Sequence, residues 1–300
     1  MTLVRLALAL LASATLAAPA LAQDGTLKKI KDSGSITIGH RDASLPLSYL
    51  DDNQKPIGYA MDICHRVVDA VKSHLKMPKI EVKYQLVTSA NRIPLMANGT
   101  IDLECGSTTN NLDRQKQVWF TMTHFVTANK FVAKRSAKLA KLDDLKGKTV
   151  VSTAGTTNIK QLTELNAQRN LGVNIVSANG HSEAFQMVES GRAAAFVMDD
   201  ILLFGLVANS KNPKQFAISQ EALSVEPYGI MLRKDDVEFK KVVDAAVSKL
   251  YKSGDAAKMY TKWFQRPIPP RKINLNVAMS AQLKKVMANP TSSGDPNDYK

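Results

Sequence analysis

The chain has 300 residues, a formal net charge of +13 and two cysteines. This length is enough for two lobes of ordinary domain size. A basic balance suits nucleic acid, an acidic membrane or an acidic ligand. The lysines are spread over the whole chain, and their densest run, between Lys130 and Lys148, is interrupted by leucines and by Asp143-Asp144. We therefore expect a solvated face there and no binding to nucleic acid.

Residues 1–22 have the three parts of a secretory signal peptide. Arg5 supplies the basic start, Leu6–Leu16 the apolar core, and Ala20-Leu21-Ala22 the small-residue cleavage site. The apolar core is shorter than the ~20 residues that span a membrane. The pattern predicts export to the periplasm, cleavage before Gln23 and a soluble mature protein, which we expect to be a monomer.

The first half of the mature chain alternates strands and helices. The expected helices are Thr26–Ser33, Met61–Leu75 and Arg92–Ala97, and the expected strands are Ile36–Gly39, Ile80–Leu86 and Ile101–Cys105. A β-α-β-α-β order is typical of a parallel sheet with helices on its faces.

A long strand, Phe125–Ala133, precedes a second round of alternation. The further expected strands are Thr149–Ser152, Val173–Val176, Ala194–Met198, Phe216–Ile218 and Tyr228–Leu232. The further expected helices are a short turn at Leu142–Gly147, Asn158–Gln168, His181–Glu189, Ile201–Asn209 and one from Phe239 to Leu250. An amphipathic helix is expected within Asn274–Met287, whereas Pro290–Lys300 has the composition of a disordered end.

Two α/β units joined by strand-like segments near residues 127 and 227 predict an α/β fold of two lobes. The expected boundaries are 23–126 with 228–273 for the first lobe, 127–227 for the second lobe and 274–300 for a C-terminal tail. The chain would then cross between the lobes twice. Two crossings predict a hinge, and a hinge with a cleft predicts closure around a ligand.

Cys64 and Cys105 allow either a disulfide or two buried thiols. Export permits a disulfide. However, Cys64 lies on an apolar helix face and Cys105 ends a strand, which are positions typical of buried free cysteines. The sequence favours the thiols, and a chain of this size should fold without the bridge.

The stretch Ser89–Gln115 concentrates the most informative side chains. Arg92 follows Ser89, and the strand that ends at Cys105 runs into a hydroxyl-rich loop that includes Ser107 and Thr109, with Arg114 just beyond. In open α/β sheets, ligands bind at the carboxyl ends of the strands. Because a guanidinium matches a carboxylate and stays charged, these arginines predict a pocket for a small carboxylate.

Four other residues lie at the ends of expected elements in the second half: Thr156, Thr157, His181 and Asp199. A helix N-terminus such as the one after Thr157 favours an anion. Each residue also has a structural explanation, because threonine and aspartate are common helix caps and a lone histidine is most often a cap or a surface residue. For Arg41, Arg92 and Arg114 that alternative is a surface ion pair. The position of the whole set at strand ends favours a binding site.

The sequence does not match the common motifs of catalytic and metal sites. A phosphate-binding loop before Gly147-Lys148-Thr149 would need glycine where Leu142 stands. A nucleophile elbow around Ser182 has Ala184 in place of its second glycine. The histidines lack paired ligand spacing, so we expect neither a metal nor another cofactor.

Several segments together resemble the periplasmic glutamate/aspartate-binding proteins of ABC transporters. These segments are His40-Arg41, Ser89–Arg92, Glu104–Asn111, Gly155–Thr157, Glu189–Arg192, Met198–Asp200, Trp263-Phe264 and Pro267–Pro270. They follow in order over essentially the whole mature chain. The resemblance implies the two-lobed type II solute-binding fold, capture of L-glutamate or L-aspartate between the lobes, and delivery to an inner-membrane permease without catalysis.

The resemblance also implies roles for individual residues. Arg114, with Thr109 and Thr157, would bind the α-carboxylate of the ligand, and Asp199, beside Ser107, its ammonium group. The side-chain carboxylate would be held by Arg41, Ser89, Arg92 and His181. Some relatives carry a cysteine where Ile230 stands, whereas this chain has Cys64, so the resemblance assigns no disulfide.

The rival interpretation is a periplasmic enzyme on the same fold, such as a dehydratase or a lytic transglycosylase. It would need a catalytic carboxylate in the cleft. Glu104 is the candidate, although a structural hydrogen-bond acceptor is the favoured explanation for it.

Overall fold

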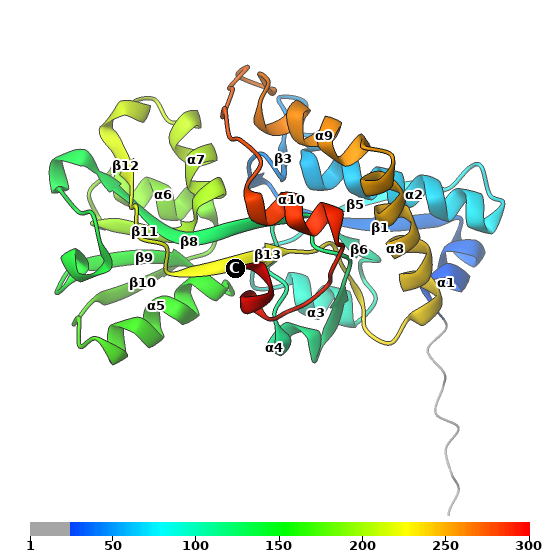
Figure 1. Cartoon of the computed structure of the whole chain (residues 1–300), viewed down its shortest axis with the longest axis horizontal. Coiled ribbons are helices and arrows are strands. Elements are labelled where there is room, and N and C mark those ends of the chain that lie inside the picture. Colours follow the sequence, from blue (N-terminus) through cyan, green and yellow to red (C-terminus); the bar gives the residue numbers. More distant parts are fainter. Residues whose placement is uncertain (1–24) are drawn as a thin grey trace, which may run out of the picture.

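The computed structural model describes residues 25–300, so the expected signal peptide lies outside the described residues. Two α/β lobes lie side by side, and the strands β8 (Phe125–Lys134) and β13 (Ser224–Tyr228) run between them (Figure 1). These two strands pair antiparallel, with Tyr228 opposite Phe125. The predicted two-lobed fold with two crossing strands is confirmed. Within the described residues, no helix is both long and apolar enough to cross a bilayer.

The first lobe is built on a five-stranded sheet of order β5-β1-β6-β14-β7. Its strands are β1 (Ser35–His40), β5 (Glu81–Leu86), β6 (Leu103–Glu104), β7 (Val118–Phe120) and β14 (Met231–Arg233). Its helices are α1 (Thr26–Ser33), α2 (Tyr59–Leu75), α3 (Arg92–Ala97), α4 (Leu112–Gln115), α8 (Val237–Lys252) and α9 (Asp255–Phe264). A small sheet of β2 (Ala43–Ser44), β3 (Ser48–Leu50) and β4 (Pro56–Ile57), which the sequence did not predict, lies beside them.

The second lobe has a sheet of order β10-β9-β11-β8-β12, with β13 also on β8. Its strands are β9 (Thr149–Thr153), β10 (Asn174–Ala178), β11 (Ala195–Asp199) and β12 (Phe216–Ile218). Its helices are α5 (Thr157–Gln168), α6 (His181–Glu189) and α7 (Asp200–Asn209), with 3-10 turns at Arg135–Ala137, Leu142–Leu145 and Pro213–Gln215. The parallel pairs β10·β9 and β11·β9 agree with the predicted alternation.

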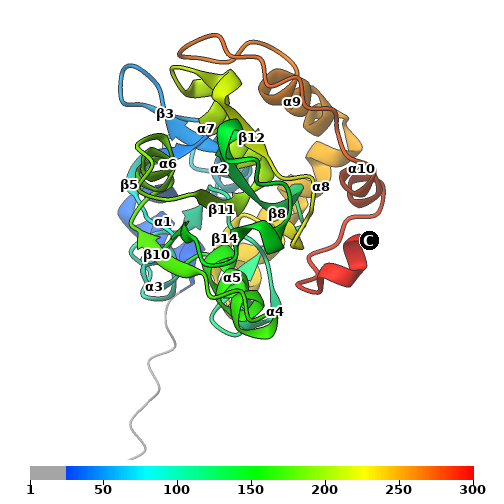
Figure 2. The ribbon, with the colours of Figure 1, turned by 90° about the vertical axis from the view of Figure 1, so that its left-hand side faces the viewer.

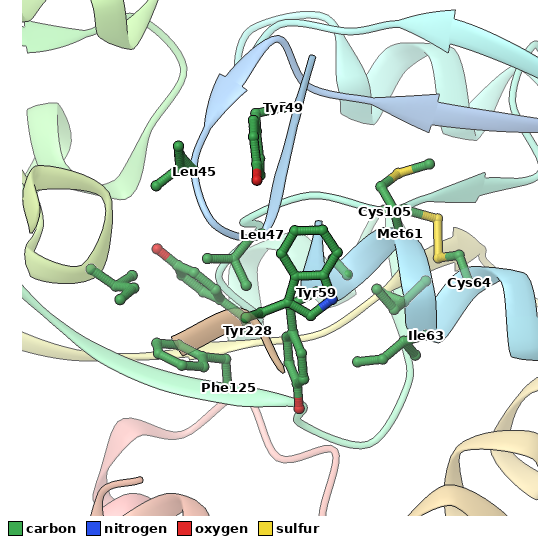
Figure 3. Close-up of a cluster of buried hydrophobic side chains, with 14 of the residues drawn as sticks. Leu45, Leu47, Tyr49, Tyr59, Met61, Ile63, Cys64, Cys105, Phe125 and Tyr228 are labelled. Atoms are coloured by element: carbon green, nitrogen blue, oxygen red, sulfur yellow. A yellow bond between two sulfur atoms is a disulfide. The ribbon is translucent and has the colours of Figure 1, made fainter. Parts of the chain in front are cut away.

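An aromatic cluster fixes the crossing strands to the first lobe. The ring of Phe125 lies 4.9 Å from Phe264 and 6.0 Å from Tyr228, and Tyr260 stacks on Phe264 at 4.3 Å. Phe125 and Tyr228 face each other in Figure 3, at the start of one crossing strand and the end of the other. Buried aromatic side chains dominate core energetics because each removes a large apolar area from water. The crossing strands therefore leave the first lobe at a rigid point.

The expectation of two buried thiols is wrong, because Cys64 and Cys105 form a disulfide. Cys64 lies on the buried face of α2, and Cys105 follows β6 directly, with 6.3 Å between the two Cα atoms (Figure 3). Both residues are fully buried, as the sequence predicted. Only the packing of α2 over the end of β6 brings them together, and a single sequence does not specify that contact.

The expected single strand Tyr228–Leu232 is also wrong. β13 ends at Tyr228 and β14 begins at Met231, so Gly229 and Ile230 carry the chain from one sheet to the other. The amide of Gly229 donates to the carbonyl of Thr108 instead of continuing either ladder. Apolar alternation continues across this junction, which is why the sequence alone did not reveal it.

The C-terminal segment Pro290–Lys300 is packed rather than disordered, contrary to expectation. Tyr299 is 1% exposed and packs with Val286 against Val126 and Val225, one residue from each crossing strand. Its hydroxyl lies 2.7 Å from Oγ1 of Thr123. Helix α10 (Ala281–Ala288) and the 3-10 turn Pro296–Tyr299 lie together on one side of the molecule (Figure 2).

Candidate functional site

The expected site residues gather where strands of the two lobes end. Arg41 follows β1 and Ser107 lies three residues after β6, whereas Thr156 lies three residues after β9 and Asp199 ends β11. Strand ends of both sheets thus face the same interlobe space, in the arrangement that binds ligands in open α/β folds.

One small, nearly filled cavity is lined by eight of the ten residues expected to bind ligand. They are Ser89, Arg92, Ser107, Thr109, Thr156, Thr157, His181 and Asp199. Asn158, Met198 and Leu202, which the sequence did not single out, complete the lining. Arg41 and Arg114 stand behind it, in contact with His181 and Thr109 respectively.

The two lobes touch each other around this cavity. Arg114 donates through Nη2 to the carbonyl of Gly155, at 3.3 Å, and the hydroxyls of Thr109 and Thr157 lie 3.5 Å apart. Gly155 has a φ of +73°, and a Cβ built there would lie 2.6 Å from Cα of Ala90 in the opposite lobe. The structure therefore represents the closed form.

The three arginines are buried, which excludes the surface ion pairs considered above. Arg41 and Arg92 are each 2% exposed and Arg114 is 7% exposed. Burial lowers the pKa of Arg41 to about 10 and that of Arg114 to about 9, so both stay protonated at neutral pH. Nε and Nη1 of Arg41 and of Arg92 are buried without a hydrogen-bond partner in the described part of the chain. Buried unpaired donors are costly, so these groups suit an anion.

His181 lies between Arg41 and Thr153, at the first residue of α6. Its Nε2 is 3.4 Å from Nη2 of Arg41, and its Nδ1 is 2.9 Å from Oγ1 of Thr153. Because a guanidinium only donates, Nε2 must accept, and the ring proton therefore sits on Nδ1. Burial, and next the charges of Arg41 and Arg92, hold the pKa of His181 well below its usual value. The ring is thus neutral and orients Arg41.

Asp199 faces the cavity and does not cap α7. Its carboxylate accepts a hydrogen bond from Nδ2 of Asn158 at 2.8 Å and another from the hydroxyl of Tyr228. Burial, and next the charge of Glu226, raise the pKa of Asp199 to about 7. A buried carboxylate in this position suits a cationic group of a ligand. Sequence reasoning missed Asn158 and Tyr228. Tyr228 was expected to begin a strand, whereas the structure places it at the end of β13.

The hydroxyl residues are engaged to different degrees. Thr156 caps α5, accepting from the amide of Ile159 at 3.3 Å, so the helix-cap explanation holds for it even though it lines the cavity. Thr157 donates to Glu226 at 3.0 Å, and Ser107 to Ser44 at 3.2 Å. The Ser89 hydroxyl is buried without a partner among residues 25–300.

Glu104 is not among the lining residues of the cavity. It is fully buried, and its Oε2 accepts a hydrogen bond from the hydroxyl of Thr108 at 2.5 Å. The expectation of a structural acceptor is confirmed. Within residues 25–300, no group of three or more His, Cys, Asp or Glu side chains gathers as metal ligands would.

Comparison with known proteins gives the class to which this closed, two-lobed site belongs. Residues 36–266 match the model of the bacterial extracellular solute-binding proteins, family 3, and the chain belongs to this family. It is 52% identical over 282 residues to the L-glutamate/L-aspartate-binding protein of Pseudomonas aeruginosa, covering 93% of each chain. It is 46% identical over 288 residues to the glutamate/aspartate import solute-binding protein of Escherichia coli, covering 95% of each.

The fold comparison agrees. An ancestral arginine-binding protein bound to arginine superposes with a TM-score of 0.69 at 29% identity, covering 77% of this chain and 98% of that one. All three names describe binding proteins, so the chain belongs with transport receptors, and the enzyme interpretation gains no support from them.

Proposed function

We propose that this protein is the periplasmic receptor of an ABC importer for L-glutamate and L-aspartate. The observation that carries the proposal is the charge pattern of the cavity. Buried arginines and one buried aspartate approach the same small space from both lobes. A dicarboxylic amino acid has two negative groups and one positive group, which is the complement of this pattern.

The geometry supports the roles that the family resemblance implies, and we adopt them in this proposal. Arg114, beside Thr109 and Thr157, binds the α-carboxylate where the two lobes meet. Asp199 receives the ammonium group, with Ser107, which also lines the cavity, beside that group. Arg92 and Ser89 carry unpaired buried donors for the side-chain carboxylate, as does Arg41, which His181 orients.

Selectivity for an acidic side chain rests on the cost of leaving buried charge unpaired. Closure removes water from Arg41 and Arg92, whose buried Nε and Nη1 donors then need a partner from the ligand. Glutamine has the shape of glutamate but no second carboxylate, and it would leave part of this pair unmatched. Sites with buried polar groups reject such analogues strongly for this reason.

The chain is expected to act outside the cytoplasm, as its family does. We further propose cleavage after Ala22, a monomeric mature chain and delivery of the ligand to an inner-membrane permease. We also propose that the first lobe comprises residues 23–126 and 228–273, and the second lobe residues 127–227. Ligand bridging the lobes would favour the closed form, because each lobe supplies part of the site.

Calorimetric titration of residues 23–300 tests the proposal. The protein should bind glutamate or aspartate tightly, and glutamine and asparagine far more weakly. Arg92→Ala and Arg114→Ala should abolish binding while the circular dichroism spectrum stays unchanged. Arg169→Ala, an exposed position on the second lobe, is the matched control and should bind normally. Titrations of both cavity variants that match wild type would overturn the assignment.

A further inference from the structure

Glu104 is a buried carboxylate beside the cavity for which the proposed function has no role. It ends β6 in the middle of the first-lobe sheet, next to Cys105 of the disulfide. Its side chain is fully buried, and while Oε2 accepts from Thr108, Oε1 has no hydrogen-bond partner in the described residues. A buried ionised oxygen needs nearby positive charge to offset its loss of water.

Arg41 and Arg92 supply that charge. A Cβ built on Gly106 would lie 2.2 Å from Oε1 of Glu104 and 3.0 Å from Cγ of Arg41. The carboxylate of Glu104 and the side-chain stem of Arg41 therefore both pack closely against Gly106. The absence of a side chain at Gly106 is what permits this approach. Burial lowers the pKa of Arg41, Arg92 and Arg114, and the charge of Glu104 opposes that lowering in all three, so Glu104 lies within electrostatic reach of them.

We propose that Glu104 is a specificity-determining residue, a buried counter-charge that limits how strongly the Arg41–Arg92 pair attracts the second carboxylate of the ligand. This inference rests on the proposed function, since it concerns the same arginines. Glu104 partly satisfies the pair before ligand arrives. An incoming carboxylate therefore gains less than it would from two uncompensated guanidinium groups, and it is repelled by Glu104 itself.

The size of the effect can be bounded from the charge alone. Removing one unit charge beside a buried ionic group, in a protein interior of effective dielectric constant about 20, changes a binding constant by about tenfold to a hundredfold. A neutral amide side chain carries no net charge and does not gain this increment. Removing the Glu104 charge should therefore strengthen binding of glutamate and leave binding of glutamine nearly unchanged. In the intact protein, Glu104 would keep affinity low enough for release to a partner.

The isosteric variant Glu104→Gln tests the proposal by titration with glutamate and, by displacement, with glutamine. We expect the affinity for glutamate to rise at least tenfold, with less than a threefold change for glutamine. Thr108→Val is the matched control, because it removes the hydrogen bond to Glu104 but keeps the charge, and it should preserve the wild-type ratio of the two affinities. Glu104→Asp, which also keeps the charge, should stay near that ratio. An unchanged ratio in Glu104→Gln, or weaker glutamate binding, would overturn the proposal.

If Glu104→Gln folds only with ligand present, it can be purified with radiolabelled glutamate and chased with unlabelled glutamate. Slower exchange than in wild type supports the proposal, and equal or faster exchange refutes it. Titration of the wild-type protein distinguishes failure of the proposed function from failure of the inference about Glu104. A wild-type protein that binds no dicarboxylate removes the proposed function, and this inference with it. Tight wild-type binding combined with an unchanged ratio removes the inference alone.

Discussion

Nη2 of Arg41 lies 3.4 Å from Nε2 of His181, although the two residues are 140 positions apart and belong to different lobes. The contact exists only when the lobes are closed. It is also the hydrogen bond that holds the guanidinium of Arg41, whose Nε and Nη1 have no partner among residues 25–300. His181 therefore acts on the ligand through Arg41.

Replacing His181 by alanine should weaken glutamate binding without unfolding the protein. A hydrogen bond to a charged group contributes about 1.5–3 kcal/mol, so the loss should be about tenfold to a hundredfold. Calorimetric titration of His181→Ala measures it. His74→Ala, an exposed position near the end of α2, is the control and should bind like wild type. Normal affinity in His181→Ala would mean that Arg41 is held in some other way.

Glutamate binding should be coupled to proton release below pH 7. In the closed form without ligand, burial and next the charge of Glu226 raise the pKa of Asp199 to about 7. The ligand ammonium requires the ionised carboxylate, so below pH 7 binding must expel a proton. Affinity should then fall by about tenfold per pH unit below 7 and be constant above it.

Titrations at pH 6 in two buffers with different ionisation enthalpies count the released proton directly. Asp199→Asn should bind weakly and release none. The folding stability of the closed form without ligand should depend on pH in the opposite direction to the affinity for glutamate. Because the folded pKa is raised above the ordinary 3.8, Asp199 favours folding fully below 3.8, and this contribution is lost as pH rises through about 7. A binding constant that is the same at pH 5.5 and pH 8 would contradict the assignment of Asp199.

Breaking the bond between Cys64 and Cys105 should lower thermal stability. The bond closes a loop between residues 41 positions apart, which corresponds to about 4 kcal/mol in the chain-entropy treatment. For a protein of this size, the midpoint of thermal unfolding should fall by about 10 °C. Differential scanning fluorimetry of Cys64→Ser/Cys105→Ser measures this, and a reductant should lower the midpoint of wild type but not that of the variant. A wild-type midpoint that reductant leaves unchanged would argue against a stabilising bridge.

Deleting residues 290–300 should reduce both stability and ligand affinity. The segment packs Tyr299 on the crossing strands, and the carbonyl of Ser292 accepts hydrogen bonds from Asn110 at 2.9 Å and from Gln115 at 3.1 Å. Those two residues flank the turn that carries Arg114. We expect the unfolding midpoint to fall by about 5–10 °C and the affinity for glutamate to fall several-fold.

Tyr299→Phe is a finer variant of the same experiment. It keeps the buried ring but removes the hydroxyl that contacts Thr123, so the loss should be only about 1 kcal/mol. Lys300→Ala, at an exposed position, should change nothing. A truncated chain with the wild-type midpoint and affinity would show that the segment is dispensable.

The sequence predicted the architecture well because the architecture depends on local patterns. Strand ends followed by polar residues, as at Arg41 and Asp199, are visible without knowing how the lobes meet. The same signal led to eight of the lining residues of the cavity. Asn158 was missed because it begins the expected helix directly after the loop, and polar residues in helices are usually solvated.

Features that depend on packing between distant elements were not predictable. Nothing local links Cys64 on its helix to Cys105 at the end of a strand, and the composition of the last eleven residues hides the single buried ring of Tyr299. The break at Gly229 lies inside an apolar run whose two halves belong to different sheets. In each case the deciding contact joins residues far apart in the chain.

Gly155 lies so close to the backbone of Ala90 that adding one methyl group at position 155 would hinder closure of the lobes. An alanine at position 155 would occupy the space where the halves of the molecule meet, and it would also strain a backbone that favours glycine. Such a variant should be produced in normal amounts and still bind its ligand weakly. A defect of this kind would appear mainly as failed uptake, because the strain of one residue lowers the unfolding midpoint only slightly.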